Sequence, residues 1–243
     1  MKKIAIVAII VFFSLSLIAA EDIFKEADQL YAQRSNVENL KKAIEMVENY
    51  IKSNPDSYDA AWRLSMYYFA LGYKVEKNKK LKVYDKAVKY GKLAVKLNDN
   101  GVEGHFWLGA SYGKYGETKG VMKSLFLVKP IKKEMNKVLK LDDTYECGGV
   151  YRVLGRLYFK VPGLFGGSKT KSLKYLLKEK EICPSNPLGR YYLADTLRKK
   201  GKKKEAIKEL EWILNLKDVD PRWAPEFEFV LKDAKKLYKK LTK

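Results

Sequence analysis

The side chains that could carry chemistry are scarce in this sequence of 243 residues. It has one histidine, His105, and two cysteines, Cys147 and Cys183. These three groups cannot supply the four ligands of an ordinary zinc site, and a lone histidine has no second one with which to relay a proton. His105 also stands beside Phe106 and Trp107, where a packed, structural histidine is expected. The sequence therefore predicts a protein that is not an enzyme and that uses no metal and no cofactor.

Two arginines form the clearest candidate for binding. Arg152 and Arg156 are four residues apart, so on a helix they lie one turn apart on the same face and can share a carboxylate. The alternative is structural, because Arg152 can pair with the nearby Glu146. Both interpretations stay open at this stage.

Segment 163–170 contains several glycines followed by Lys169 and Thr170, a combination also seen in phosphate-binding loops. The order Gly-x-x-x-x-Gly-Lys is absent, and no strand precedes the segment. We expect a turn with unusual backbone angles, in which Leu164 and Phe165 are available to a partner.

The chain is strongly basic, with 49 Lys and Arg against 29 Asp and Glu and a formal net charge of +20. Such a field favours anionic partners. Only seven of the cations are arginine, however, and a surface rich in lysine is typical of solubility rather than of base recognition. We expect no nucleic-acid partner. Basic segments 77–80 and 198–204 read as soluble turns, although the second can also contact anionic lipid headgroups.

The first twenty residues have the pattern of a secretory signal peptide. Two lysines follow Met1, an uncharged run extends from Ile4 to Ala20, and Glu21 opens a charged sequence. We expect cleavage after Ala20 and a periplasmic or otherwise exported protein. The alternative is an uncleaved N-terminal membrane anchor, because the run could barely span a bilayer.

The remainder, residues 21–243, predicts an all-α domain. Apolar residues recur at intervals of three and four, and breaker sequences such as Asn54-Pro55-Asp56 recur about every forty residues. These breaks predict a single domain of about five helical hairpins, followed by a last helix from Trp223 to Leu241.

One sequence pattern occurs four times in this domain. Each copy has a leucine in an aromatic-rich helix, followed directly by a small residue that lets a second helix pack closely. The leucines are Leu64, Leu108, Leu154 and Leu193. This pattern resembles the tetratricopeptide repeat family, and the resemblance implies antiparallel helix pairs stacked into a right-handed superhelix.

In that family the first helix of each pair lines the concave surface. The resemblance therefore selects, as ligand-binding or partner-binding residues, Trp62, Met66, Phe69, Phe106, Arg152, Arg156, Phe159, Tyr191 and Arg198. The expected groove grades from apolar to cationic, which suits a hydrophobic ligand, a carboxylate ligand or the helix of a protein partner. The alternative is that these aromatic stripes are core.

A narrower resemblance rests on Gly148–Tyr158 running into Pro162–Ser168, which is similar to the tetratricopeptide-like T component of TRAP transporter systems. It implies an exported accessory subunit that associates with a periplasmic solute-binding protein, and in some members a homo-oligomer. The alternative function is an envelope adaptor that grips peptide segments and has no small-molecule ligand.

The hairpin register also predicts a disulfide. Cys147 stands just before the first helix of its pair and Cys183 just after the second, and these two ends are neighbours in an antiparallel hairpin. In the oxidising compartment that an exported chain reaches, the two thiols would be oxidised to a disulfide. Two free, buried thiols are the alternative.

Overall fold

The computed structural model describes residues 20–243, and every regular element in this range is helical. A first helix covers residues 20–32. The elements that follow are α2 (Val37–Ser53), α3 (Tyr58–Lys74), α4 (Lys80–Leu97), α5 (Val102–Lys119), η1 (Met122–Leu127), α6 (Val128–Leu141), α7 (Tyr145–Lys160), η2 (Gly163–Phe165), α8 (Lys169–Ile182), α9 (Pro187–Lys199), α10 (Lys203–Leu214) and α11 (Ala224–Thr242). Apart from Ala20, the predicted signal segment lies outside the described residues.

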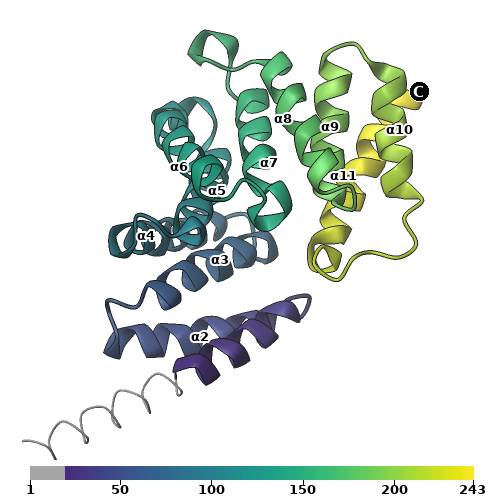
Figure 1. Cartoon of the computed structure of the whole chain (residues 1–243). Helices are drawn as coiled ribbons and strands as arrows, with labels where there is room; N and C mark the ends of the chain where they lie inside the picture. The colour runs from purple at the N-terminus through teal and green to yellow at the C-terminus, as the bar shows by residue number, and fades with distance from the viewer. Residues whose placement is uncertain (1–19) are drawn as a thin grey trace, which may run out of the picture.

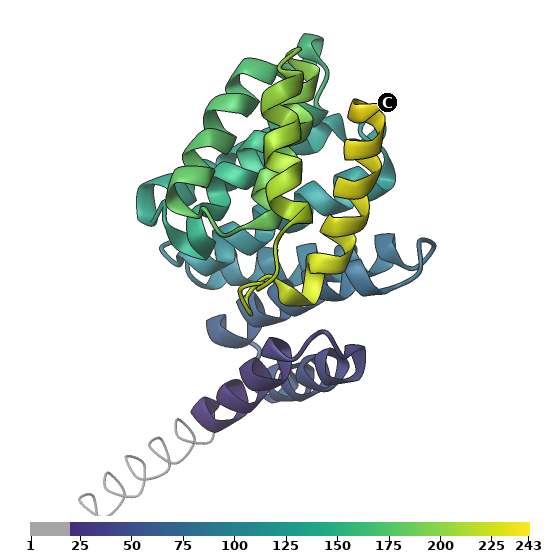
Figure 2. The ribbon, with the colours of Figure 1, turned by 90° about the vertical axis from the view of Figure 1, so that its right-hand side faces the viewer.

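Consecutive helices pair into hairpins that stack side by side (Figure 1). The pairs are α3 with α4, α5 with α6, α7 with α8 and α9 with α10, and the second helix of one pair packs on the first helix of the next. The prediction of an all-α, tetratricopeptide-like solenoid is confirmed. Figure 2 shows that α11, in yellow, stands alongside the hairpins and does not continue their row.

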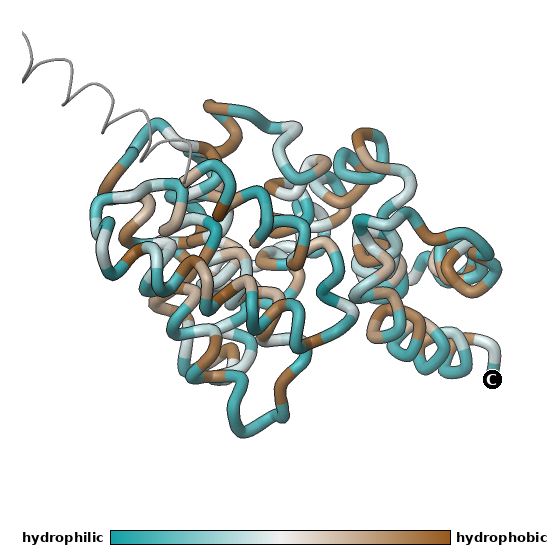
Figure 3. The backbone as a smooth tube through the Cα atoms, turned by 90° about the horizontal axis from the view of Figure 1, so that it is seen from below, coloured by the Kyte–Doolittle hydropathy of each residue, from teal (hydrophilic) through white to brown (hydrophobic). Residues whose placement is uncertain are grey.

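The repeated leucines form the core between the two helices of each pair. Leu64, Leu108, Leu154 and Leu193 are at most 3% exposed. The small residue after each leucine allows the helices to approach closely: a Cβ at Gly155 would lie only 2.6 Å from Leu176 Cγ. Figure 3 shows hydrophobic residues interspersed with hydrophilic ones along the helices, as expected when each helix buries one face.

Polar side chains cap the starts of several helices. Asn36, Ser57 and Asn186 each accept a hydrogen bond from a backbone N–H in the first turn of α2, α3 and α9. Such caps satisfy donors that have no partner within the helix. Asn186 lies in a predicted break and Ser57 directly follows one, whereas Asn36 lies outside the predicted breaks.

The first turn of α7 departs from helical geometry. Glu146, Cys147 and Gly148 have positive φ angles of 51°, 58° and 68°. This left-handed stretch is unfavourable for the two residues that carry a Cβ. It turns the chain sharply between α6 and the regular part of α7.

The last helix reaches back to the end of α3 and to the N-terminal hairpin, which consists of the first helix (residues 20–32) and α2. Arg34 Nε donates to Glu226 Oε1 at 2.8 Å, and Arg34 Nη2 donates to Glu226 Oε2 and to the Arg222 carbonyl at 2.9 Å. Lys74, the last residue of α3, donates to the carbonyl of Pro225 at 2.5 Å. Helix α11 therefore spans the concave side, from the C-terminal hairpin to the N-terminal one. None of the helices in residues 20–243 is long and apolar enough to cross a membrane.

Candidate functional site

The concave side of the solenoid holds a cavity of about 850 Å³. Helices α3, α5, α6, α7 and α9 contribute to its walls, and α11 supplies residues between Glu226 and Asp233 on another side. Because α11 lies across the concave surface, the space is walled on more sides than an open groove would be. A volume of this size falls in the range of small-molecule sites.

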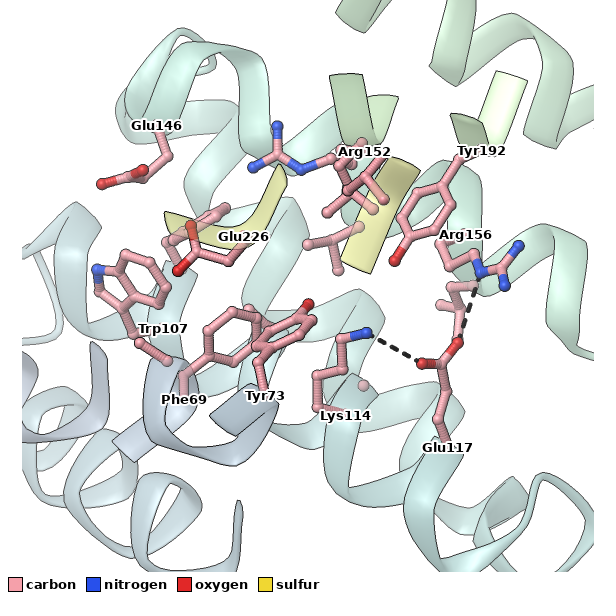
Figure 4. A pocket seen from close by; sticks show the side chains of 18 of the residues that line it. Phe69, Tyr73, Trp107, Lys114, Glu117, Glu146, Arg152, Arg156, Tyr192 and Glu226 are labelled. Atoms are coloured by element: carbon pink, nitrogen blue, oxygen red, sulfur yellow. Dashed lines mark hydrogen bonds and ion pairs between the residues drawn. The ribbon is translucent and has the colours of Figure 1, made fainter. Parts of the chain in front are cut away.

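Aromatic side chains form much of the lining. Phe69 packs edge-to-face on Trp107, with ring centroids 5.4 Å apart, and Trp107 in turn packs on Phe106 at 5.0 Å. Figure 4 shows Phe69, Tyr73 and Trp107 together on one side of the cavity. These rings give the cavity an apolar surface that an apolar ligand body can cover.

A cationic cluster lies beside these rings and surrounds Glu117. Lys114 Nζ lies 3.3 Å from one carboxylate oxygen of Glu117, and Arg156 Nε lies 3.5 Å from the other (Figure 4). Lys160 Nζ lies 3.8 Å from the same oxygen as Arg156. Burial by itself raises the pKa of the Glu117 carboxyl, but these cations outweigh burial and lower the pKa to about 2. Arg156 also pairs with Asp195 at 3.2 Å. Arg198 pairs with Asp195 as well, so four cations face two carboxylates and leave a surplus of positive charge.

A second polar group lies around Glu146. Burial raises the pKa of its carboxyl, and the charges of Arg152, Arg34 and Arg222 oppose that rise. The three arginines form their short ion pairs with other carboxylates. The neighbouring Trp223 lines the cavity, and its buried indole Nε1 has no hydrogen-bond partner among residues 20–243. This region therefore offers a free N–H donor to a polar ligand atom.

The structure brings together some of the predicted binding residues and leaves others elsewhere. Phe69, Phe106, Arg152, Arg156 and Tyr191 all line the cavity, although they come from four separate helices. These five residues, selected by their positions relative to the repeated leucines, therefore lie on one surface.

Four predicted residues do not line the cavity. Trp62 Nε1 donates to Asp59, Met66 is 7% exposed in the core, and Arg198 pairs with Asp195 on its own helix. Phe159 is 8% exposed. Residues at equivalent positions of the repeats therefore do not all face the cavity, as Met66 and Arg156 show.

Arg152 forms its ion pair with Glu179 and not with Glu146, the structural alternative considered from the sequence. Arg152 Nη1 donates to Glu179 Oε1 of α8 at 3.1 Å, and Glu179 is fully buried. Asn186 donates to the same oxygen at 2.8 Å. The left-handed turn at Glu146 explains the difference, because it takes this residue out of helical register with Arg152.

The cysteine and histidine positions are clearly defined. Cys147 and Cys183 are joined in a disulfide, with Cα atoms 5.5 Å apart. His105 is 1% exposed, with Nδ1 2.6 Å from Glu134 Oε2 and Nε2 2.9 Å from the Asp99 carbonyl oxygen. Both ring nitrogens face acceptors, which favours the doubly protonated ring. Within residues 20–243 no cluster of three or more acidic, histidine or cysteine side chains is suited to a metal.

Sequence reasoning missed most of the charged residues that line the cavity. The main omissions are Arg34, Arg222 and Glu226, together with Lys114 and Glu117 at the C-terminal end of α5. The scarcity of arginine was an unused signal: four of the seven arginines line this one cavity.

Solved structures support the same fold. TTC0263, a thermophilic TPR protein of Thermus thermophilus, aligns with a TM-score of 0.61 at 19% identity, covering 87% of this chain and 98% of that chain. Two structures of MamA align with TM-scores of 0.50 and 0.51, both at 16% identity, covering 85% and 90% of this chain and 95% and 93% of theirs. At these identities the likeness shows the fold alone. No curated protein sequence matches.

A family model gives a closer assignment. The model described as regulator of microtubule dynamics protein 1-3 matches residues 23–166, from the first helix through the α7–α8 turn. This match covers more than half of the chain and includes the aromatic lining, the Glu117 cluster and the left-handed turn. The chain therefore belongs to the family of regulator of microtubule dynamics proteins 1-3.

Proposed function

We propose that this chain is a non-enzymatic binding protein that holds a small amphipathic ligand in its central cavity. The observation that carries the proposal is the position of α11, which turns a concave groove into a cavity of about 850 Å³. An extended peptide needs an open groove along the solenoid, and α11 crosses that path. The cavity therefore suits a compact ligand better than a peptide.

The lining indicates the chemistry of the ligand. The aromatic rings of α3 and α5 suit an apolar body, and the surplus positive charge in the Glu117 cluster suits an acidic group such as a carboxylate. A ligand carboxylate there would make charge-assisted hydrogen bonds in a poorly solvated site, where such bonds are strong.

The test uses 8-anilino-1-naphthalenesulfonate, a probe that combines aromatic rings with an anionic group. Replacing Arg152 and Arg156 together by glutamine should weaken binding at least tenfold, which corresponds to about 1.4 kcal/mol for the loss of charge-assisted contacts. Fluorescence titration and calorimetry measure the affinity.

Arg63 and Arg190 provide the matched control. Their side chains are 15% and 13% exposed, close to the 12% and 16% of the tested pair, and both form ion pairs outside the cavity. The control variant, with both changed to glutamine, should bind the probe like the unchanged protein. Equal weakening in both variants, or unchanged binding by a folded test variant, would contradict the proposal.

Export is part of the same proposal. The basic start and apolar run of residues 1–20 support it, as does the pairing of the only two cysteines. N-terminal sequencing should find Glu21 first, and alkylation of the unfolded, unreduced protein should find no free thiol. Recovery of intact Met1 in the integral membrane fraction would favour the anchored alternative.

We further propose an accessory role in solute uptake of the TRAP type, with a periplasmic solute-binding protein as partner. The resemblance of Gly148–Tyr158 and Pro162–Ser168 to the T component supports it. Genes for a membrane permease and a solute receptor beside this gene would strengthen this role. Selective capture of extended peptides by a protein that does not bind the small probe would favour the envelope adaptor instead.

A further inference from the structure

We infer that one end of the solenoid docks on an anionic membrane surface. The surface consists of the three turns within the hairpins α5–α6, α7–α8 and α9–α10, spanning residues 119–132, 160–171 and 198–204, and is called here the basic end. Figure 1 shows the second and third of these turns side by side at the top of the molecule.

The charge of the basic end is one-sided. Its three turns contain thirteen Lys and Arg and no Asp or Glu. At the other end of the same helices, residues 97–103, 141–146 and 182–187 contain five Asp and Glu and no Lys or Arg, and residues 215–223 contain two cations and two Asp. The net charge is therefore not spread evenly over the hairpins but concentrated at one end, where it attracts an anionic surface.

Contacts between the turns make the basic end continuous. Lys132 Nζ, in α6, lies over the ring of Tyr158 in α7 at 4.8 Å, and within 3.7 Å of the position that a Cβ on Gly166 would take. Lys200, beyond α9, donates to Thr170 Oγ1 at the start of α8 at 2.9 Å. The three turns thus form one surface and not three separate loops.

The same end carries the most exposed large apolar side chains of the described chain. Leu164 is 90% exposed, Met122 and Phe126 are each 62% exposed, and Phe165 is 46% exposed. All four belong to the inserted turns η1 and η2. Exposed apolar tips surrounded by lysines match the polarity of a lipid interface, where the tips enter the acyl boundary and the ammonium groups meet phosphates. A purely electrostatic partner would not require the tips.

Vesicle co-sedimentation tests the inference, with the full chain and, in parallel, the form that starts at Glu21. Vesicles of phosphatidylcholine alone are compared with vesicles containing phosphatidylglycerol. We expect binding of the shorter form only to the anionic vesicles, weakening as salt rises because exposed charges are screened. In the full chain, every comparison is made between variants that carry the same residues 1–20.

Two variants separate the apolar and the charged contributions. The first changes Met122, Phe126, Leu164 and Phe165 to serine. The second changes four exposed lysines without ion-pair partners among the described residues to glutamine; these are Lys123, Lys129, Lys199 and Lys203. Each variant should lower the vesicle partition coefficient of the shorter form at least tenfold. The serine variant loses the apolar tips that enter the acyl boundary, and the glutamine variant loses four cations near the anionic surface.

The control removes the same charge elsewhere, by changing four other exposed lysines to glutamine: Lys42, Lys96, Lys140 and Lys217. It should retain at least half of the binding. Equal loss in the control would attribute binding to net charge alone and overturn the inference. The inference would also be overturned if the protein did not bind anionic vesicles, or if the serine variant bound them like the unchanged protein. If such a protein bound a polynucleotide tightly, the basic end would be assigned to another polyanion.

Discussion

The contact between α11 and the N-terminal hairpin gives the sharpest test of how the cavity is closed. Glu226 accepts two hydrogen bonds from the guanidinium of Arg34, and the side chains are 21% and 10% exposed. Changing Glu226 to glutamine keeps the size of the side chain and removes its charge. It leaves Arg34 with the carbonyl of Arg222 as its remaining strong acceptor.

The expected cost lies between two limits. Removing one partner of a fully buried ion pair costs about 3–5 kcal/mol, and an exposed pair is worth at most about 1 kcal/mol. For this partly buried pair, which is bidentate, we expect a loss of about 2 kcal/mol, or about a 30-fold increase in local opening. The loss should open only the beginning of α11. Farther along the helix, Val230, Ala234 and Leu237 still pack on the C-terminal hairpin.

Hydrogen exchange measures this opening directly. Amides in the first half of α11 should exchange about 30-fold faster in the variant, while amides of α7 and α8 should be unchanged. Glu228→Gln is the matched control, since Glu228 is exposed on the same helix. If exchange in α11 is the same in both variants, the ion pair does not hold the wall of the cavity, and the apolar face alone does so.

The remaining predictions concern the fold that positions the site. Acceptors at both nitrogens outweigh burial and raise the pKa of His105. Protonated His105 should therefore stabilise the fold fully below pH about 6.5, and this stabilisation should be lost as the pH rises through the pKa of the folded state. Changing Glu134 to glutamine should flatten this part of the plot of unfolding free energy, measured with urea, against pH. Changing Gly155 to alanine should destabilise the fold by about 1–3 kcal/mol, because the new Cβ would meet Leu176. Changing Gly113 to alanine should stabilise it by up to about 1 kcal/mol, because no atom lies within 4 Å of the new Cβ. Equal effects of the two changes on the denaturation midpoint would refute the packing argument. Replacing both cysteines by serine should cost about 4 kcal/mol of unfolding free energy for a disulfide separation of 36 residues, measured against the oxidised protein; an unchanged midpoint would show that the bridge does not constrain the unfolded chain.

Local sequence patterns specify the helical repeat and much of its register. Burial of one face of each helix produces the spacing of three and four, and the need to cap helix ends places Asn and Ser at the breaks, so both features can be read locally. Leu64, Leu108, Leu154 and Leu193 are buried as a consequence of that local pattern. The same periodicity places Arg152 and Arg156 on one face of their helix, and the resemblance to tetratricopeptide repeats implied that this face lines the concave side.

The residues that meet on the concave face depend on contacts between distant parts of the chain. The path of α11 depends on contacts between residues almost two hundred positions apart, such as Arg34 with Glu226, and no local pattern encodes such a contact. The partner of Arg152 changed from Glu146 to Glu179 because a left-handed turn rotates one carboxylate away and a neighbouring helix brings another near. Helical periodicity specifies which face of a helix is buried, whereas the twist between hairpins and the docking of the last helix specify which buried faces meet around a cavity.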